Sequence, residues 1–477
     1  MQVPEAMRPL LRVWTHRNYA CFMGGMSPAL ITLWMQRIGM LWLAWELTRS
    51  NTWVGIIVAL DYLPMLLLAP FVGAFTDRAN PVQVQKWAQW LNLALSAVMA
   101  GLTFAGLMNI WLLAFLSLVL GCLHPFNAIS RHAIVPNTVP KEEIPTALAT
   151  DSALYNAARF IGPALAGVLI EFFGVGYAIA ANSVGCAFYL LGLYAMRLDF
   201  PDRKGHGHPG MLKDIAEGLA FVRGHAGIGP LFLLMTIGAI WIRPLQDLLP
   251  GFADQVFQAG PSGLGILTAA MGVGATIAAA FVAMYARTTG LVLFVMLAFL
   301  ANILATWAFV ATSFLWIAVL FAALWGGTLT MMSTGTQALV QSAVDNSIRA
   351  RVMSLYTMIY RGAPFLGAIV IGWAADRIGL QLAFAIAALL CVLPWLNAIR
   401  KRTAMTVALE GRGNDLDERL MAKSKALAGL AHEQLVDLRL RAKPIAGKVA
   451  SSTRLAWEKT RNLKIGDKLQ ALRQRKE

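Results

Sequence analysis

The chain has 477 residues, of which 58% are hydrophobic and 14% are charged. Its mean hydropathy is +0.60, whereas soluble domains are less apolar and carry about 25% charged residues. This composition excludes a soluble enzyme, a disordered chain and a secreted disulfide scaffold, and it predicts a protein that crosses a membrane many times. The four cysteines lie in apolar sequence and form no C-x-x-C pair, so buried thiols without a metal or redox role are expected.

Stretches long enough to span a membrane follow one another along most of the chain. A spanning helix needs about 20 mainly apolar residues. Twelve such spans are predicted, at 19–47, 52–75, 84–106, 108–130, 144–172, 175–196, 228–250, 262–286, 289–311, 313–340, 352–375 and 380–400. Strand-like alternation is not seen, so the predicted fold class is all-α and integral to the membrane, with twelve transmembrane helices.

A polar stretch divides the spans into two sets of six. The predicted parts are a cytoplasmic N-terminus at 1–18, an N-terminal six-helix bundle at 19–196, an inter-bundle loop at 197–227, a C-terminal six-helix bundle at 228–400 and a basic tail at 401–477. The loop is expected to contain a short amphipathic helix from Met211. Its two histidines, His206 and His208, lie in Gly-rich polar sequence, so no metal site is predicted.

The tail is polar, basic and outside the spans. It carries 18 Lys and Arg against 9 Asp and Glu, and leucines recur in it at helical spacing. Contact of its basic side with anionic lipid is the preferred hypothesis. A leucine face that binds a partner or a second copy, and a largely disordered tail, are the alternatives.

The distribution of Lys and Arg predicts the orientation, because loops rich in these residues remain cytoplasmic. Before the tail, sixteen of them fall on the side of the N-terminus, and the opposite loops hold only Arg49 and Arg377. Both termini are therefore predicted to be cytoplasmic, and the first apolar stretch is interpreted as a retained span and not as a cleaved signal peptide.

The two halves of the chain resemble each other. Pro163 corresponds to Pro364 after 201 residues, and Arg37 corresponds to Arg243 after 206 residues. A repeat of this length is typical of transporters with two-fold pseudo-symmetry, whose substrate site lies between the halves near the bilayer midplane.

The segment GAFTDRANPVQVQKW, between the second and third spans, resembles the signature loop of the major facilitator superfamily. Its matching residues are Gly73, Asp77, Arg78 and Lys86. The segments LAWELTRSNTWVG, SRHAIVPNTVPKEEIPTALATDSALYNAARFIGPALAG and RARVMSLYTMIYRGAPFLGAIVIGWAADRIG resemble the branch that contains enterobactin exporters and macrolide efflux pumps. The resemblance covers about residues 10–400.

This resemblance implies a secondary active transporter, not an enzyme, that works by alternating access in a bacterial cytoplasmic (inner) membrane. It implies export of a small amphipathic molecule, such as a drug or siderophore-like compound, by proton antiport, with no cofactor and no nucleic-acid partner. The chain departs from the branch at Ala158 and Ala166, where the antiporter motif has glycines. The alternatives are an importer or facilitator of an anionic metabolite, a lysolipid flippase, and a non-transporting membrane scaffold that uses the tail.

Charged residues inside spans are the main functional candidates, because each costs about 2.5–3.5 kcal/mol on insertion scales and needs a partner. Arg37 and Asp61 lie at similar depth on neighbouring spans, where they form either a proton switch or a structural ion pair. Arg243 and Asp247 are four residues apart on one helix face, with Pro244 between them to loosen the helix. They either pair with each other or meet an anionic substrate.

Further candidates fall into three sets. The predicted substrate pathway also includes Arg159, Arg361, Trp34, Tyr62, Tyr155, Asn156, Trp241, Tyr356 and Tyr360. Helix bending or close approach is predicted at Gly162, Pro163, Gly362 and Pro364. The superfamily resemblance implies a cytoplasmic gate of Gly73, Asp77, Arg78, Lys86 and Arg131, in which an aspartate caps the span at 352–375. His124 is either a proton relay or a satisfied buried histidine.

Overall fold

The structure is a computed structural model that describes residues 12–76, 78–198, 211–284 and 290–410. These residues belong to the first of two compact units, which covers residues 1–412. Within the described ranges the regular structure is entirely helical, which confirms the predicted all-α class. The predictions for Asp77, His206, His208 and most of the tail concern residues outside these ranges.

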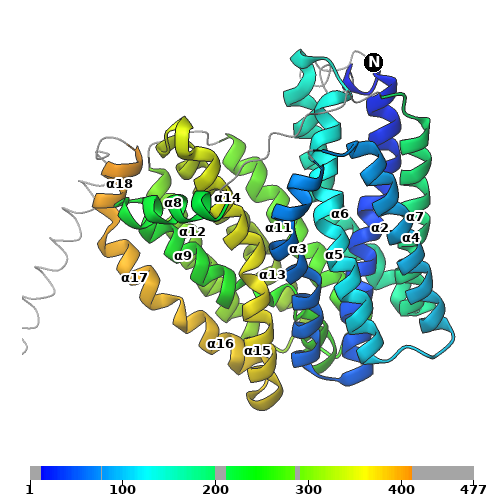
Figure 1. The fold of residues 1–477 in the computed structure, drawn as a ribbon. Coiled ribbons are helices and arrows are strands. Elements are labelled where there is room, and N and C mark those ends of the chain that lie inside the picture. The colour runs from blue at the N-terminus through cyan, green and yellow to red at the C-terminus, as the bar shows by residue number, and fades with distance from the viewer. Residues whose placement is uncertain (1–11, 77, 199–210, 285–289, 411–477) are drawn as a thin grey trace, which may run out of the picture. The chain divides into compact units, whose positions relative to one another are not determined.

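The first group of long helices comes from the N-terminal half of the chain. It consists of α2 (Arg17–Thr48), α3 (Asn51–Thr76), α4 (Pro81–Phe104), α5 (Ile110–Ile134), α6 (Ile144–Phe173) and α7 (Val175–Ala195). Helix α2 packs against α6 and α7, α3 packs against α5, and α4 packs against α5 and α7 (Figure 1). The Asn80 side chain accepts hydrogen bonds from the Val82 and Gln83 amides, and this N-cap begins α4.

The second group follows α8 (Met211–Gly224), the helix predicted from Met211. It consists of α9 (Ile228–Trp241), α11 (Gly260–Met284), α12 (Leu291–Val310), α13 (Leu315–Ala343), α14 (Asn346–Gly362), α15 (Pro364–Ile378), α16 (Leu380–Leu390) and α17 (Val392–Arg400). Helix α13 packs against both α11 and α12, and α16 packs against both α12 and α15 (Figure 1).

Prolines interrupt two of the predicted spans. The span at 228–250 is helical only to Trp241 and continues as a 3-10 turn at Arg243–Leu245, the short α10 (Leu249–Gly251) and a π-helical turn at Phe252–Val256. Pro244 has no backbone N–H and its ring clashes with the preceding turn, so the helix ends just before it. The span at 352–375 divides at Ala363 into α14 and α15, because Pro364 fits only the first turn of a new helix.

Ten helical stretches of the described chain are long and apolar enough to cross a membrane. The predicted spans 19–47 and 84–106 are not among them, although α2 and α4 have 32 and 24 residues. These helices carry polar side chains that satisfy one another in the interior: Ser96 Oγ donates to Gln36 Oε1 at 3.1 Å, and Asn182 Nδ2 donates to the same oxygen at 2.5 Å. The number of twelve spans therefore stays a prediction.

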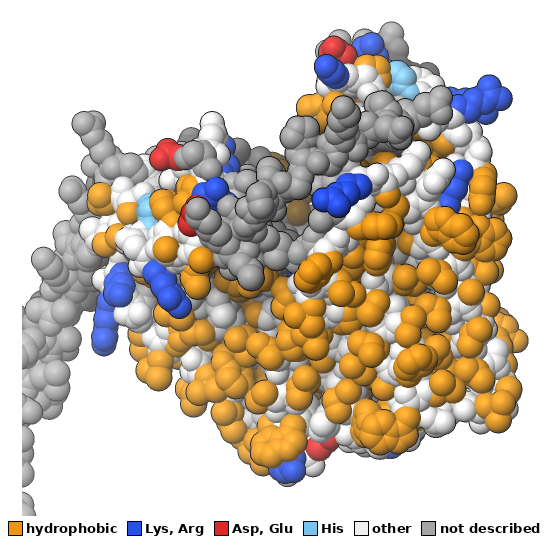
Figure 2. Space-filling view, viewed as in Figure 1, with side chains coloured by type: hydrophobic (Ala, Val, Ile, Leu, Met, Phe, Trp, Pro, Cys, Tyr) orange, Lys and Arg blue, Asp and Glu red, His pale blue; other side chains and the backbone are white. Residues whose placement is uncertain are grey.

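The surface of the described helices is largely apolar. Hydrophobic side chains cover most of the viewed face, and Lys and Arg gather toward the end where the N-terminus lies (Figures 1 and 2). This is the surface expected of helices that face lipid, because apolar side chains exposed on this scale would not be tolerated in water.

Glycines bring helices of the two groups into close contact. A Cβ atom on Gly167 of α6 would lie 2.7 Å from the Gly265 Cα of α11, and a Cβ atom on Gly55 of α3 would collide with the Ala368 carbonyl of α15. Only glycine allows backbones to approach this closely. The pairs α3–α15 and α6–α11 therefore form the most extensive contacts between the groups.

The first residues of the predicted tail pack with the other helices. Helix α18 (Arg402–Glu410) buries Met405 and Leu409. The Glu410 carboxylate accepts hydrogen bonds from the Gly290 and Val292 amides, at 2.6 and 2.7 Å, and so caps the start of α12.

Candidate functional site

Arg37 of α2 lies between two carboxylates. Its Nη1 atom is 3.1 Å from Asp61 Oδ2, and its Nη2 atom is 3.1 Å from Asp247 Oδ1. The two aspartates are only 8% and 9% exposed. The contact predicted between Arg37 and Asp61 is therefore present. Because Asp61 lies on α3 and Asp247 follows α9, one guanidinium links both helix groups electrostatically.

The second oxygen of Asp61 also has a partner. His124 Nε2 of α5 lies 2.7 Å from Asp61 Oδ1. An imidazole at this distance can share or take the proton of the carboxyl group. Both roles predicted for His124, the proton relay and the satisfied buried side chain, would use this contact. We call Arg37, Asp61, His124 and Asp247 the charge cluster.

Arg243 and Asp247, one of whose predicted alternatives was a mutual pair, have other partners in the described structure. The helix breaks at Pro244, and the i, i+4 geometry that would align the two side chains is lost. Asp247 meets Arg37 instead. Arg243 donates to the Tyr360 carbonyl oxygen at 2.5 Å, and its guanidinium lies 4.2 Å from the centroid of the Tyr360 ring.

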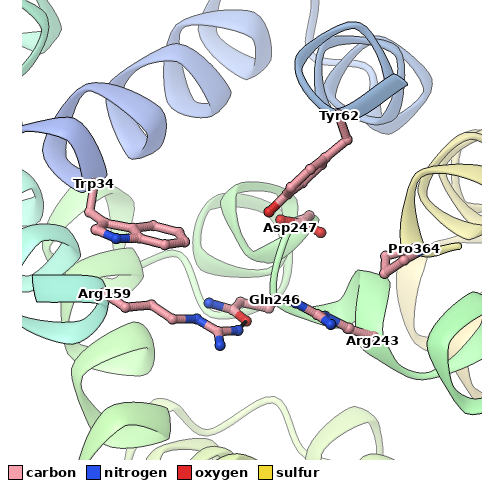
Figure 3. Close-up of a pocket in the computed structure, with 7 residues that line it drawn as sticks. All are labelled: Trp34, Tyr62, Arg159, Arg243, Gln246, Asp247 and Pro364. Carbon is pink, nitrogen blue, oxygen red and sulfur yellow. Dashed lines mark hydrogen bonds between the residues drawn. The ribbon is translucent and has the colours of Figure 1, made fainter. Parts of the chain in front are cut away.

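A small pocket lies beside the charge cluster. It is lined by Trp34, Tyr62, Arg159, Arg243, Gln246, Asp247 and Pro364 (Figure 3). Figure 3 shows the Tyr62 hydroxyl pointing toward Asp247, and Arg159 beside Gln246. Arg159 Nη2 donates to Gln246 Oε1 at 2.7 Å. Five of the predicted pathway residues, Trp34, Tyr62, Arg159, Arg243 and Asp247, are therefore brought together.

A second pocket shares Arg159 and Gln246 with the first. Its other lining residues are Phe160, Met271, Ala275, Trp325, Gly326, Leu329, Thr330 and Tyr360. Most of these are apolar, so a polar region in the first pocket continues into an apolar one. Tyr356, a predicted pathway residue, stacks on Tyr360 with ring centroids 5.8 Å apart.

Five predicted pathway residues line neither pocket, and Tyr356 is one of them. Tyr155 lies between the Trp34 ring, at 6.1 Å, and the Arg131 guanidinium, at 4.8 Å. The exposed Asn156 donates to the Ser152 carbonyl of its own helix. Trp241 is partly buried against the core, and Arg361 is exposed.

The predicted gate residues that the structure describes contact their own helix group. Arg131 Nη2 lies 3.1 Å from Asp151 Oδ2, and Lys86 Nζ lies 4.2 Å from the centroid of the Tyr194 ring. Arg78 is exposed, and a Cβ atom on Gly73 would meet open space. Their role as a gate therefore depends on Asp77, which lies outside the described residues.

The helix-bend residues adjoin the pockets. A Cβ atom on Gly162 would lie 2.6 Å from both the Ile31 carbonyl oxygen and Trp34 Cβ, so this glycine lets α6 approach α2 beside Trp34. Pro163 lies inside α6, and a Cβ atom on Gly362 would lie 3.2 Å from the Leu66 side chain of α3. Close approach, one of the two predicted roles, thus fits Gly162.

The comparisons with known proteins agree with this fold. A family model described as transmembrane secretion effector matches residues 26–425. The chain belongs to this family. It is a transporter of the major facilitator superfamily, as the signature loop and the branch motifs predicted.

Proteins similar in sequence to this chain include named transporters. Macrolide efflux protein A of Streptococcus pyogenes is 22% identical over 81% of this chain and 98% of its own. The staphyloferrin A transporter of Staphylococcus aureus is 22% identical over 74% of this chain and 88% of its own. The crystal structure of the nucleoside transporter NupG matches with a TM-score of 0.63 and 13% identity, over 83% of this chain and 99% of that one. This last likeness shows the fold alone.

A carboxylate that sequence reasoning missed joins the helix groups where α2 gives way to α3, which we call the α2–α3 end. Asp376 of α15 accepts hydrogen bonds from the Asn51 and Thr52 amides, at 2.7 and 3.0 Å, and from the hydroxyls of Ser50 and Thr52, at 2.5 and 2.6 Å. It thus caps the N-terminus of α3. A pattern in the sequence does mark Asp376, because Gly372, Asp376 and Arg377 repeat the spacing of Gly73, Asp77 and Arg78.

Replacing Asp376 with Asn should open the α2–α3 end. The amide cannot accept from so many donors and carries no charge for the α3 terminus, so the Asn51 and Thr52 amides should exchange hydrogen at least about tenfold faster, as expected for loss of about 1.4 kcal/mol of local protection. Hydrogen exchange measured by mass spectrometry on the peptide that contains them tests this. Arg377→Gln is the matched control, because among the described residues the Arg377 side chain bonds to the Trp373 carbonyl and lies over the Trp373 ring, both in its own helix. Unchanged exchange in Asp376→Asn would contradict the capping role.

Proposed function

We propose that this family member is a proton-coupled exporter of a small amphipathic molecule. The observation that carries the proposal is the charge cluster. Asp61 lies between His124 and Arg37, and Arg37 also holds Asp247 of the other helix group. A proton arriving at Asp61 would remove its charge, leave Arg37 to Asp247 alone and change the link between the groups.

Alternating access would use the two helix groups as its moving parts. In this proposal α2–α7 and α9–α17 are the two six-helix bundles, with the domain boundaries predicted at 19–196 and 228–400. The α2–α3 end faces the outside and both termini face the cytoplasm. The contacts of Asp376 and the glycine pairs then close the outer side, which supports a state open toward the cytoplasm. The proposed location is a bacterial inner membrane.

Opening and closing on the cytoplasmic side is assigned to the signature loop. Asp77→Asn should slow the transport cycle without abolishing substrate binding, because a gate changes the populations of states and not the binding pocket. Transport rate and binding affinity, measured on the same preparation, test this. Glu46→Gln, at an exposed carboxylate near the C-terminal end of α2, is the control. Loss of binding in Asp77→Asn would mean that the residue is not a gate.

The proposed function is tested on purified protein in proteoliposomes that contain a trapped pH dye. Lipophilic cations, macrolides, catechol siderophores and organic anions are added one at a time across an imposed pH gradient. At least one class should cause saturable proton movement that protein-free liposomes lack. Saturable uptake without proton movement would contradict antiport.

One observation favours a second candidate, a facilitator or exchanger of an anionic metabolite. Arg159 and Arg243 meet neutral groups, the Gln246 side chain and the Tyr360 carbonyl, and not carboxylates. Substrate uptake that is saturable, anion-specific and independent of the pH gradient would select this candidate.

A further inference from the structure

The two pockets carry positive charge that the protein does not balance. Arg37 meets the carboxylates of Asp61 and Asp247, whereas Arg159 and Arg243 line the first pocket and have only neutral partners. The three guanidiniums thus face two carboxylates, which leaves one net positive charge. Within the described chain, no carboxylate lies within ion-pair distance of either guanidinium. A guanidinium in a low-dielectric interior strongly favours a counter-ion, since an unpaired buried charge costs several kcal/mol by general estimates.

The buried polar atoms that lack a partner in the pocket walls are all donors. They are Arg159 Nε, Trp34 Nε1 and Trp325 Nε1. Buried donors rarely remain without an acceptor, so these three N–H groups indicate a ligand rich in acceptor oxygens. The fork of N–H groups on an arginine also matches the two oxygens of a carboxylate or phosphate.

The remaining wall is apolar. The second pocket continues from Arg159 past Phe160, Met271 and Leu329 to the ring of Trp325. In the described state each pocket has room for little more than a water molecule, so a substrate needs the helix groups to move apart. A molecule that reaches both pockets would then place an anionic group at the arginines and an apolar body against these side chains.

We propose that the transported molecule is an amphipathic organic anion, whose carboxylate or phosphate group binds between Arg159 and Arg243. This inference rests on the proposed transport function and names the substrate class of the same site. It disfavours lipophilic cations, because a cation would enter a region where three arginines and two aspartates already leave one net positive charge.

Three probes that each carry the same dansyl group test the charge preference of the site, on the full-length protein in detergent. They are N-dansyl-6-aminohexanoate, its methyl ester and dansylcadaverine, which carry a carboxylate, no charge and an ammonium group. Dansyl fluorescence should report saturable binding of the carboxylate at least about tenfold tighter than of the other two, equivalent to about 1.4 kcal/mol. Competition by lysophosphatidic acid shows whether a lipid phosphate enters the same site or only a free carboxylate does.

Arginine variants locate the site. Arg159→Gln and Arg243→Gln should each weaken carboxylate binding at least about tenfold, and Arg159→Lys should recover part of it because the charge returns. Arg377→Gln, which lines neither pocket, should bind as the wild type does. Without ligand, Arg159→Gln should unfold at the same temperature as the wild type or at a higher one, because an unbalanced charge is removed. If Arg159 belonged to a structural ion pair, its replacement would lower the unfolding temperature instead.

Three results would overturn the inference: tighter binding of the ammonium or ester probe, carboxylate binding that both Gln variants leave unchanged, and no binding of any anionic probe.

The binding assay and the proton-movement assay together separate this inference from the proposed function. Carboxylate binding without proton movement would retain the anion site and contradict proton coupling. Proton movement driven only by cations would retain proton coupling and contradict the anion site.

Discussion

Asp61→Asn should abolish substrate-driven proton movement while leaving folded protein in the membrane. Asparagine keeps the size of the side chain and can still contact Arg37 and His124, but it cannot take up and release a proton in the working pH range. Asp61 is the carboxylate that faces both groups, at 3.1 Å from Arg37 and 2.7 Å from His124. The trapped-dye signal should therefore fall to the level of protein-free liposomes.

The variant should still bind and exchange substrate, because Asp61 does not line either pocket. Counterflow of a labelled substrate between loaded and unloaded proteoliposomes measures this exchange separately from proton coupling. Asp345→Asn, which removes an exposed carboxylate from another part of the chain, controls for the loss of one negative charge. Proton movement of normal size in Asp61→Asn would show that another group carries the proton.

Arg37→Gln should strongly destabilise the protein. It removes the shared partner of Asp61 and Asp247, so the buried Asp247 carboxylate loses its ion pair and Asp61 keeps only the contact with His124. Breaking a buried ion pair by removing one partner costs about 3–5 kcal/mol. The apparent unfolding temperature of the purified protein should fall by several degrees, whereas Arg377→Gln should leave it unchanged.

The loss of folding stability in Arg37→Gln should depend on pH. Unpaired carboxylates bind protons more readily in the folded variant than in the unfolded chain, so the stability of Arg37→Gln should rise as the pH falls. Adding Asp247→Asn should restore part of the stability, because the unpaired Asp247 charge is then removed. An unfolding temperature equal to that of the wild type at neutral pH would mean that Arg37 is not the structural centre of the cluster.

Much of the fold could be predicted because lipid imposes simple rules. Long apolar runs placed the helices, and the depth of Arg37 and Asp61 in antiparallel neighbours was enough to predict their contact. The hydrogen bonds among Gln36, Ser96 and Asn182 satisfy polar side chains that α2, α4 and α7 carry in the interior. Only the tertiary structure shows that those side chains meet.

The site was harder to predict because its helix is broken. Pro244 was recognised as a weak point, but the break also turns Asp247 toward Arg37 and brings Gln246 to Arg159. No local pattern marks such a long-range contact, since Gln246 in sequence is simply the polar residue before Asp247. Asp376 is different, because its motif repeats the spacing of the signature loop and could have been found.

Uphill transport driven by a pH gradient tests the central claim most directly. Proteoliposomes with an acidic interior are placed in a neutral solution of N-dansyl-6-aminohexanoate, and the internal concentration is followed. Passive weak-acid permeation would deplete this compound from the acidic interior, and so would proton symport. Proton antiport should instead accumulate the compound above its external concentration, and this accumulation should be lost in protein-free liposomes and in Asp61→Asn. Equal or lower internal concentration with the wild-type protein would contradict proton-coupled export of an organic anion.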